Sequence, residues 1–193
     1  MTGLDPNSPL VLDTRALHLQ RRPGSMITVL RTVPAPADCG VALARVPQGS
    51  DIELDLRLES VMEGVWVSGA ADIQVEAECA RCLEPVNWTE TIDLQQMYEY
   101  QPTDARGAVV VDLEQDDDPL PQVQDDMIDL EPTLRDAVVL ELPLSPLCRS
   151  DCAGLCPECG TILQDDPHHA HEQVDPRWAA LSRLTDPDSQ RGA

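Results

Sequence analysis

Residues 52–59 read Ile-Glu-Leu-Asp-Leu-Arg-Leu-Glu. Successive side chains of a β-strand point to opposite faces, so this alternation predicts a strand with one buried and one solvated face. After a turn signal at residues 63–64 the alternation resumes from 65 to 79, and after a second turn at 81–85 it continues from 86 to 98. Three such runs joined by short turns predict an antiparallel β-meander.

The alternation also assigns a core face to these runs. One face of the predicted sheet carries aliphatic and aromatic side chains, whereas the other carries mainly acidic and polar ones. Apolar side chains gathered on one face of a sheet bury each other against a covering layer. The positions expected in the core are Ile52, Leu54, Leu56, Leu58, Val65, Val67, Ala71, Ile73, Val75, Ala77, Cys79, Val86, Trp88, Ile92, Leu94 and Tyr98.

Helices are expected to supply that covering layer. Asp129 can cap a helix from Leu130 to Leu142, because its carboxylate can accept hydrogen bonds from the free N–H groups of the first turn. Pro143 then ends the helix. A second, short amphipathic helix is expected near the C-terminus, around residues 178–184. The fold class is therefore predicted as α+β, an antiparallel β-meander packed by one or two helices.

The chain is strongly acidic. Its 35 Asp and Glu residues face 13 arginines and no lysine, which gives a formal charge of −22. Binding to naked nucleic acid gains affinity when cations replace the counterions of phosphates, so this balance favours a basic protein partner over RNA. If RNA is contacted, the candidate residues are Arg81, Arg21 and Arg22, with Arg15 beside them. Arg81 could equally be a solvated turn residue.

Membrane and secretion signals are not found in the sequence. Within the first 15 residues, Asp5, Pro6 and Pro9 stand where a signal peptide needs an apolar core, and no uncharged apolar run approaches 18 residues. The chain is therefore expected to be cytoplasmic and not to interact with membranes.

Seven cysteines occur in the chain. Disulfides are rare in proteins of the reducing cytoplasm, and an odd count argues against a fully paired framework, so the cysteines are predicted to be metal ligands. Cys39 stands apart from the others and is expected to be an ordinary buried thiol.

The strongest metal motif is Cys156-Pro-Glu-Cys159-Gly160. Two intervening residues let both thiolates reach one ion, and the glycine lets the chain turn so that backbone N–H groups point at the sulfurs. Such a zinc knuckle supplies two ligands, whereas a structural zinc site has four. The motif therefore predicts a Zn²⁺ site that needs two more ligands.

Three sources could supply these ligands. A neighbouring pair would complete a local four-thiolate site, a distant pair with knuckle spacing would close a long-range site, and nearby histidines would give a mixed site. The preferred set is Cys148, Cys152, Cys156 and Cys159, and the second choice draws on Cys79, Cys82, His169 and His171, with His168 in the same loop. The histidines could equally form a solvated polar loop.

Catalytic interpretations receive less support from the sequence. A catalytic zinc keeps an open position, and neither a His-Glu-x-x-His nor a His-x-Glu motif is found. A redox pair at Cys79 and Cys82 is conceivable, with Arg81 lowering a thiol pKa. Such pairs normally open a helix, whereas this one lies between two predicted strands. The chain is therefore predicted not to be an enzyme.

These features fit together in one organisation. The expected parts are an irregular N-terminal segment (1–25), an α+β domain (26–145), a small C-terminal zinc-knuckle segment with a short helix (146–186) and a disordered tail (187–193). Residues 33–36 are predicted to form a linker or extended turn, residues 109–111 a short strand, and residues 115–124 a mobile acidic loop.

The order of the motifs resembles the YceD family, which is named for accumulation of large-subunit ribosomal RNA. The resemblance extends from about residue 10 to residue 184. It is carried by Cys79-Ala-Arg-Cys82-Leu83-Glu84-Pro85, Leu142-Pro143, Cys152-Ala-Gly-Leu-Cys156-Pro-Glu-Cys159-Gly160, Asp175-Pro176-Arg177 and, as in actinobacterial members, Arg22-Pro23-Gly24-Ser25.

The resemblance implies a binding role in the accumulation or processing of large-subunit (23S) ribosomal RNA and in ribosome assembly, without an established catalytic activity. It implies a large-subunit precursor or a basic ribosomal protein as partner. Some relatives carry the first cysteine pair but lack the later cluster, which favours the local four-thiolate site. Other relatives place further cysteines where this chain has histidines, so these histidines could replace them as ligands. An adaptor that binds metal and partners unrelated to ribosomes is the alternative.

Overall fold

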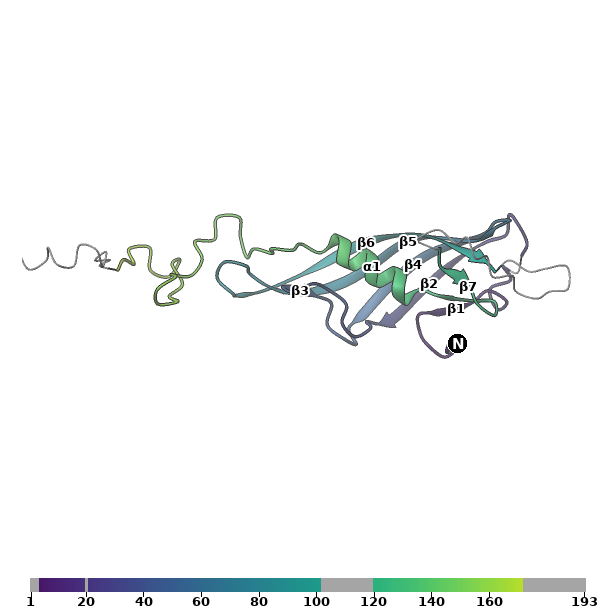
Figure 1. Ribbon diagram of the computed structural model, residues 1–193, viewed down its shortest axis with the longest axis horizontal. Coiled ribbons are helices and arrows are strands. Elements are labelled where there is room, and N and C mark those ends of the chain that lie inside the picture. The colour runs from purple at the N-terminus through teal and green to yellow at the C-terminus, as the bar shows by residue number, and fades with distance from the viewer. Residues whose placement is uncertain (1–3, 20, 102–119, 172–193) are drawn as a thin grey trace, which may run out of the picture. The chain divides into compact units, whose positions relative to one another are not determined.

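The computed structural model (Figure 1) describes residues 4–19, 21–101 and 120–171. It divides into two compact units, Met1–Cys152 and Ala153–Ala193. Eight strands and one helix lie within the described residues, all in the first unit. They are β1 (Val11–Asp13), β2 (Met26–Pro34), β3 (Ala44–Arg45), β4 (Asp51–Ser60), β5 (Gly64–Glu78), β6 (Pro85–Tyr100), β7 (Gln122–Val123), β8 (Met127–Asp129) and α1 (Glu131–Glu141).

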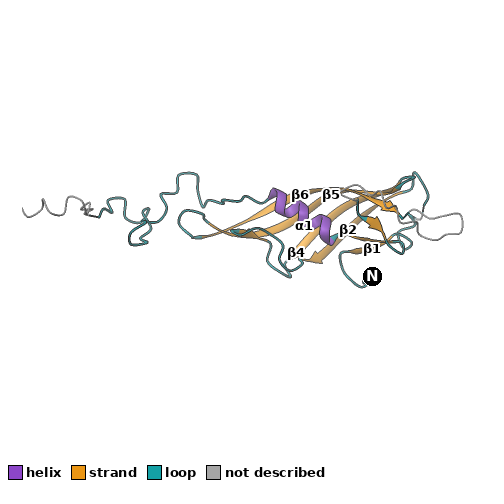
Figure 2. Ribbon diagram, in the orientation of Figure 1, coloured by secondary structure: helices purple, strands orange, loops and turns teal. Residues whose placement is uncertain are grey.

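The meander predicted from the alternating runs is confirmed. Strands β4, β5 and β6 pair antiparallel in sequence order, and the sheet is extended by β2 next to β4 and by β7 next to β6. Figure 2 shows these strands as one sheet with α1 over one face. The alternate apolar residues of β4 and β5 are buried, as the pattern requires. In β6, however, Val86 and Trp88 are only partly buried.

Three short elements differ from the prediction. Residues 33–34 end β2 instead of forming a linker, the segment 1–25 contains β1, and residues 122–123 form β7 within the predicted acidic loop. β1 pairs with β8, and β7 pairs parallel to β6. A strand of two or three residues is too short to give a recognisable period. In β2 the outward Leu30 and a run of exposed residues obscure the alternation.

The helix α1 is confirmed within one residue at each end. Asp129 accepts a hydrogen bond from the backbone N–H of Glu131 (3.0 Å), and Pro132 occupies the first turn. Leu134 and Val138 are buried, four residues apart on the same side of the helix, and α1 packs on β6. Together with the sheet, this helix establishes the α+β class.

Tyr98 joins the helix to the sheet. Its hydroxyl donates to the backbone oxygen of Asp129 (3.0 Å) and lies 2.6 Å from the Thr133 hydroxyl. The side chain is 1% exposed. A buried hydroxyl with two partners holds the start of α1 against β6.

We expect the Tyr98→Phe variant to lose about 1.5 kcal/mol in free energy of unfolding, because both polar partners lose a buried hydrogen bond. Burial raises the pKa of Tyr98 to about 12. The folded state therefore favours the neutral hydroxyl, and this contribution is expected to be lost as the pH rises from about 10 to about 12. Urea unfolding of both chains at neutral pH and across this range measures both effects. Equal stability of the two chains would contradict them.

Other predictions fall on residues outside the described part of the chain. These are the strand at 109–111, the acidic loop before residue 120, the helix around 178–184 and the tail at 187–193. In the part that is described, no helix is long and apolar enough to cross a membrane.

Candidate metal centres

The first cysteine pair lies in the tight turn between β5 and β6. The Cys79 N–H donates to the Glu84 oxygen (2.9 Å) and the Leu83 N–H donates to the Cys79 oxygen (2.9 Å). Leu83 has a positive φ of 62°, a conformation that is unfavourable for a branched side chain. The turn holds Cys79 and Cys82 at the tip of the longest hairpin of the described sheet.

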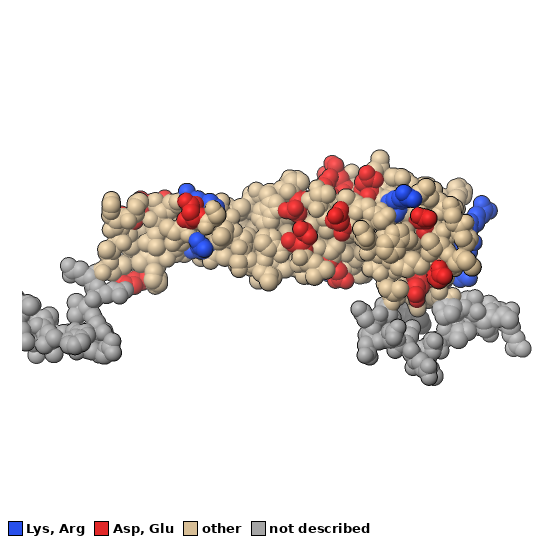
Figure 3. Space-filling view, turned by 90° about the horizontal axis from the view of Figure 1, so that it is seen from above, with Lys and Arg blue, Asp and Glu red and all other residues tan. Residues whose placement is uncertain are grey.

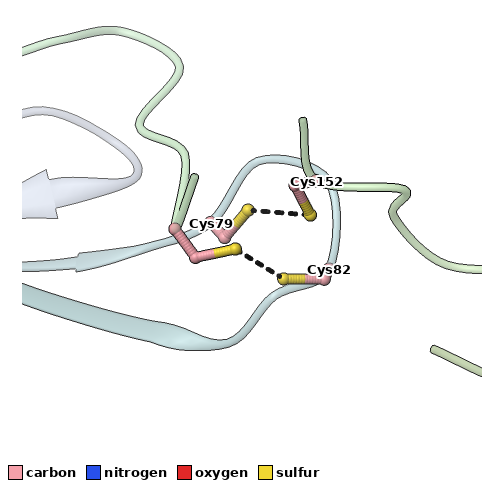
Figure 4. A group of neighbouring side chains, drawn as sticks. Cys79, Cys82 and Cys152 are labelled. Atoms are coloured by element: carbon pink, nitrogen blue, oxygen red, sulfur yellow. Dashed lines mark hydrogen bonds between the residues drawn. The ribbon is translucent and has the colours of Figure 1, made fainter. Parts of the chain in front are cut away.

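The segment after α1 returns to this turn. The Ala80 N–H donates to the Pro146 oxygen (2.8 Å), and Arg81 Nη1 donates to the Cys152 oxygen (2.9 Å). These bonds align residues 146–152 with the hairpin tip. Figure 4 shows Cys79, Cys82 and Cys152 with their sulfurs pointing toward one another.

Four sulfurs form the first group, which we call the four-thiolate group: Cys79, Cys82, Cys148 and Cys152. The Sγ atoms of Cys79 and Cys152 are 3.8 Å apart, those of Cys82 and Cys148 are 3.6 Å apart, and all four lie within 4.8 Å of one another. Four thiolates on a tetrahedral zinc with bonds of about 2.3 Å would be about 3.8 Å apart. The spacing therefore fits a closed structural zinc site.

Hydrogen bonding and burial shift the pKa values of these thiols in opposite directions. A backbone hydrogen bond from Cys148 is the main cause that lowers the pKa of Cys79 to about 6, which favours its thiolate form. Burial raises the pKa of Cys148. For Cys82, the Glu84 backbone lowers the pKa, but burial and the neighbouring thiols outweigh it and raise the pKa to about 12. Metal binding would displace the remaining protons, since the thiolate is the ligand.

The backbone turns tightly at residues 156–160, where the sequence predicts a zinc knuckle. The Gly160 N–H donates to the Cys156 oxygen (2.9 Å), the Cys156 N–H donates to the Thr161 oxygen (2.8 Å), and Leu155 bridges Ile162. Gly160 has a φ of +74°, which a residue without a side chain adopts freely. A second group of ligand atoms forms here: Cys156, Cys159, His169 and His171.

The geometry does not reproduce the predicted ligand set. The structure assembles Cys148 and Cys152 with the hairpin cysteines, while Cys156 and Cys159 meet two histidines. The second-choice ligands are also divided, since Cys79 and Cys82 lie in one group and His169 and His171 in the other. The sequence favoured one set from Cys148 to Cys159 because these cysteines are close along the chain. The backbone hydrogen bond from Ala80 to Pro146 instead brings the segment after α1 to the hairpin. His168 belongs to neither group, and whether metal binds is still a prediction.

The arginines proposed for RNA do not form one patch. Arg21 donates its N–H to the Tyr100 hydroxyl (3.2 Å) at one end of the sheet, and Arg22 follows it in the same loop. Arg81 lies beyond Glu78 at the opposite end of β5, a strand of 15 residues. At about 3.3 Å per residue these ends are about 45 Å apart. The Arg81 side chain also supports the backbone of Cys152, a structural role.

Cys39 and the possible redox pair Cys79/Cys82 can also be judged from their surroundings. Cys39 is buried and outside both groups, and burial raises its pKa. Cys79 and Cys82 join two strands and do not open a helix. Because both are buried beside two further thiols, their setting is typical of metal ligands more than of an accessible redox pair.

The sequence also matches a known protein family. Residues 67–185 match the family described as large ribosomal RNA subunit accumulation protein YceD. The chain belongs to the YceD family. The resemblance found in the sequence is thus confirmed. The matched range includes the pairs Cys79/Cys82 and Cys156/Cys159 and all residues of both candidate metal groups. The family is described by the accumulation of ribosomal RNA and not by a reaction.

Relatives of the chain occur in two bacterial groups. An uncharacterized protein of Mycobacterium tuberculosis is 45% identical over 182 residues, which cover 94% of this chain and 84% of the relative. An uncharacterized protein of Mycobacterium leprae is 43% identical over 181 residues, which cover 94% of this chain and 80% of the relative. YlbN of Bacillus subtilis is 29% identical over 141 residues, covering 70% and 73%. No solved structure matches the chain.

Proposed function

We propose that this chain is a non-enzymatic zinc-binding factor that supports large-subunit (23S) ribosomal RNA accumulation and processing, and thereby ribosome assembly in the cytoplasm. The observation that carries the proposal is the family match over residues 67–185. A metal-binding adaptor for another complex is the alternative, and a thiol protein acting through Cys79 and Cys82 has less support.

Zinc is proposed to hold the four-thiolate group together. Soft thiolates in a tetrahedral arrangement select zinc or iron–sulfur centres, and the 3.6–3.8 Å sulfur separations suit a single ion. With four protein ligands, no position remains for a substrate or water. The proposed role of zinc is therefore to fix the hairpin tip to the segment after α1. We propose that the protein works by binding a partner and not by catalysing a reaction.

A basic ribosomal protein is the proposed partner, within a large-subunit precursor. The solvent face of the sheet supports this proposal, since Glu53 of β4 lies directly opposite Asp72 of β5 and both are exposed. Like charges on directly opposed positions destabilise a sheet, and a basic partner would offset that repulsion. Figure 3 shows acidic side chains spread along one face of the molecule, with basic ones in small groups.

We expect the chain to co-sediment with large-subunit precursors and to be released by salt, because charge attraction weakens as ionic strength rises. Sucrose-gradient fractions from cells that express the tagged full chain are probed at low and high salt. In a deletion strain, the ratio of mature 23S to 16S RNA is expected to fall, and re-expression of the wild-type chain restores it.

The proposal would be overturned by absence of the chain from every ribosomal fraction together with a normal 23S level in the deletion strain. Capture of non-ribosomal partners alone would favour the adaptor. If RNA were bound directly, ribonuclease treatment would release the chain from the precursors, whereas a bound ribosomal protein would retain it.

A further inference from the structure

The second group of ligand atoms occupies a segment with little means of folding by itself. Among the described residues of the second unit, only Gly154 and Cys156 are buried. Ordering a residue costs about 1–2 kcal/mol of backbone entropy, and segments this small normally need a metal or disulfides to stay folded. The convergence of four side chains here therefore requires a stabilising interaction other than a hydrophobic core.

The histidines direct the same ring atom toward one cysteine. His169 Nε2 lies 3.1 Å and His171 Nε2 lies 3.2 Å from the Cys159 sulfur, and the two nitrogens are 2.8 Å apart. Cys156, on the other side of the knuckle, keeps its sulfur within 4.8 Å of these atoms. Two thiolates and two imidazole nitrogens are a frequent ligand set of structural zinc.

The opposite ring atoms provide an independent indication. His169 Nδ1 lies 3.6 Å from an Asp166 carboxylate oxygen, and His171 Nδ1 lies 3.4 Å from a Glu158 carboxylate oxygen. A histidine that binds zinc through one nitrogen usually donates its other N–H to a carboxylate, which fixes the ring and strengthens the ligand. Each histidine thus has a carboxylate near the ring nitrogen that faces away from Cys159, a placement that a solvated polar loop does not require.

We propose that Cys156, Cys159, His169 and His171 form a second zinc site, separate from the four-thiolate group, and that zinc binding folds residues 153–171. Asp166 and Glu158 position the two histidines. The chain then holds two zinc ions in chemically different sites. This inference shares only the choice of metal with the proposed function and needs no ribosomal role.

The test counts zinc in the purified full chain. We expect two ions in the wild-type chain and one in His169→Ala/His171→Ala, whereas the matched control His168→Ala keeps two because that histidine is outside both groups. Cobalt replacement separates the sites, since loss of the histidines should leave only the spectrum of a four-thiolate cobalt centre. One ion in the wild-type chain, or an equal loss in His168→Ala, would overturn the proposal.

A second measurement covers the possibility that the double variant is merely misfolded. Replacement of the positioning carboxylates by Glu158→Gln and Asp166→Asn leaves all four ligands, and the second site should weaken about 10–100-fold in zinc affinity. Amide NMR signals of Ile162 and Leu163 should lose dispersion when zinc leaves this site, while those of Ile73 in β5 stay unchanged. Unchanged affinity in the carboxylate variants, or dispersed signals without zinc, would contradict the inference, and neither result bears on ribosome association.

Discussion

The variant Cys82→Ser/Cys148→Ser is expected to lose the zinc of the four-thiolate group and to unfold on the order of 10 °C below the wild-type chain. Two thiolates remain, which is too few for a closed tetrahedral site. A metal that binds only the folded state stabilises it in proportion to the logarithm of its concentration over its Kd. Loss of the ion therefore removes that whole contribution.

Metal analysis and calorimetry of the full chain measure this effect. The matched control is Cys39→Ala, which removes another buried thiol outside both groups and should keep all bound zinc. Its small loss of apolar contact should lower the midpoint by only a few degrees. If the double variant kept its zinc and its unfolding temperature, the four cysteines would not be ligands.

The Gly69→Ala variant is expected to lose about 3 kcal/mol in free energy of unfolding. Gly69 lies in the middle of β5, opposite Leu56 of β4 and Leu94 of β6. A Cβ at this position would meet the Asp55 backbone oxygen at 2.0 Å, and its φ of +151° is strained for any other residue. Because the neighbouring atom is backbone, the sheet itself must shift.

Gly49→Ala is the control for this variant. Gly49 also has a positive φ, +80°, but a Cβ there would have no atom within 4 Å. Its cost should be about 1 kcal/mol from the backbone alone. Chemical unfolding of both variants separates crowding from backbone strain. Equal losses of unfolding free energy in the two variants would contradict the crowding argument, because they would show that the β4 backbone at Asp55 moves aside at little cost.

The sequence predicted the long elements because each carries many repeats of one period. β4, β5 and α1 present their apolar residues at strand or helix spacing over 10 or more positions. β2 was not predicted because exposed Leu30 faces outward, and its place beside β4 depends on cross-strand contacts that its own residues do not encode. Short strands such as β1 are fixed only by their partner.

The residue types that gather in the two groups were predictable from the sequence, whereas their grouping was not. Knuckle spacing at Cys156 and Cys159 reports a local backbone turn, which the structure has. The partners of Cys148 are instead determined by where the chain goes after α1. A clue was present: Cys79 and Cys82 have knuckle spacing of their own, so two knuckles could have indicated two separate groups of ligand atoms.

The hydrogen bond between Ala80 and Pro146 has a consequence for the order of events during synthesis. Cys82 and Cys148 are 66 positions apart. At about 5–20 residues per second, the ribosome adds Cys148 about 3–13 s after Cys82. During this interval Cys79 and Cys82 lack Cys148 and Cys152, so the proposed zinc ion would meet all four ligands only when the sheet and α1 have been made. Filling of the proposed zinc site would therefore mark a completed domain.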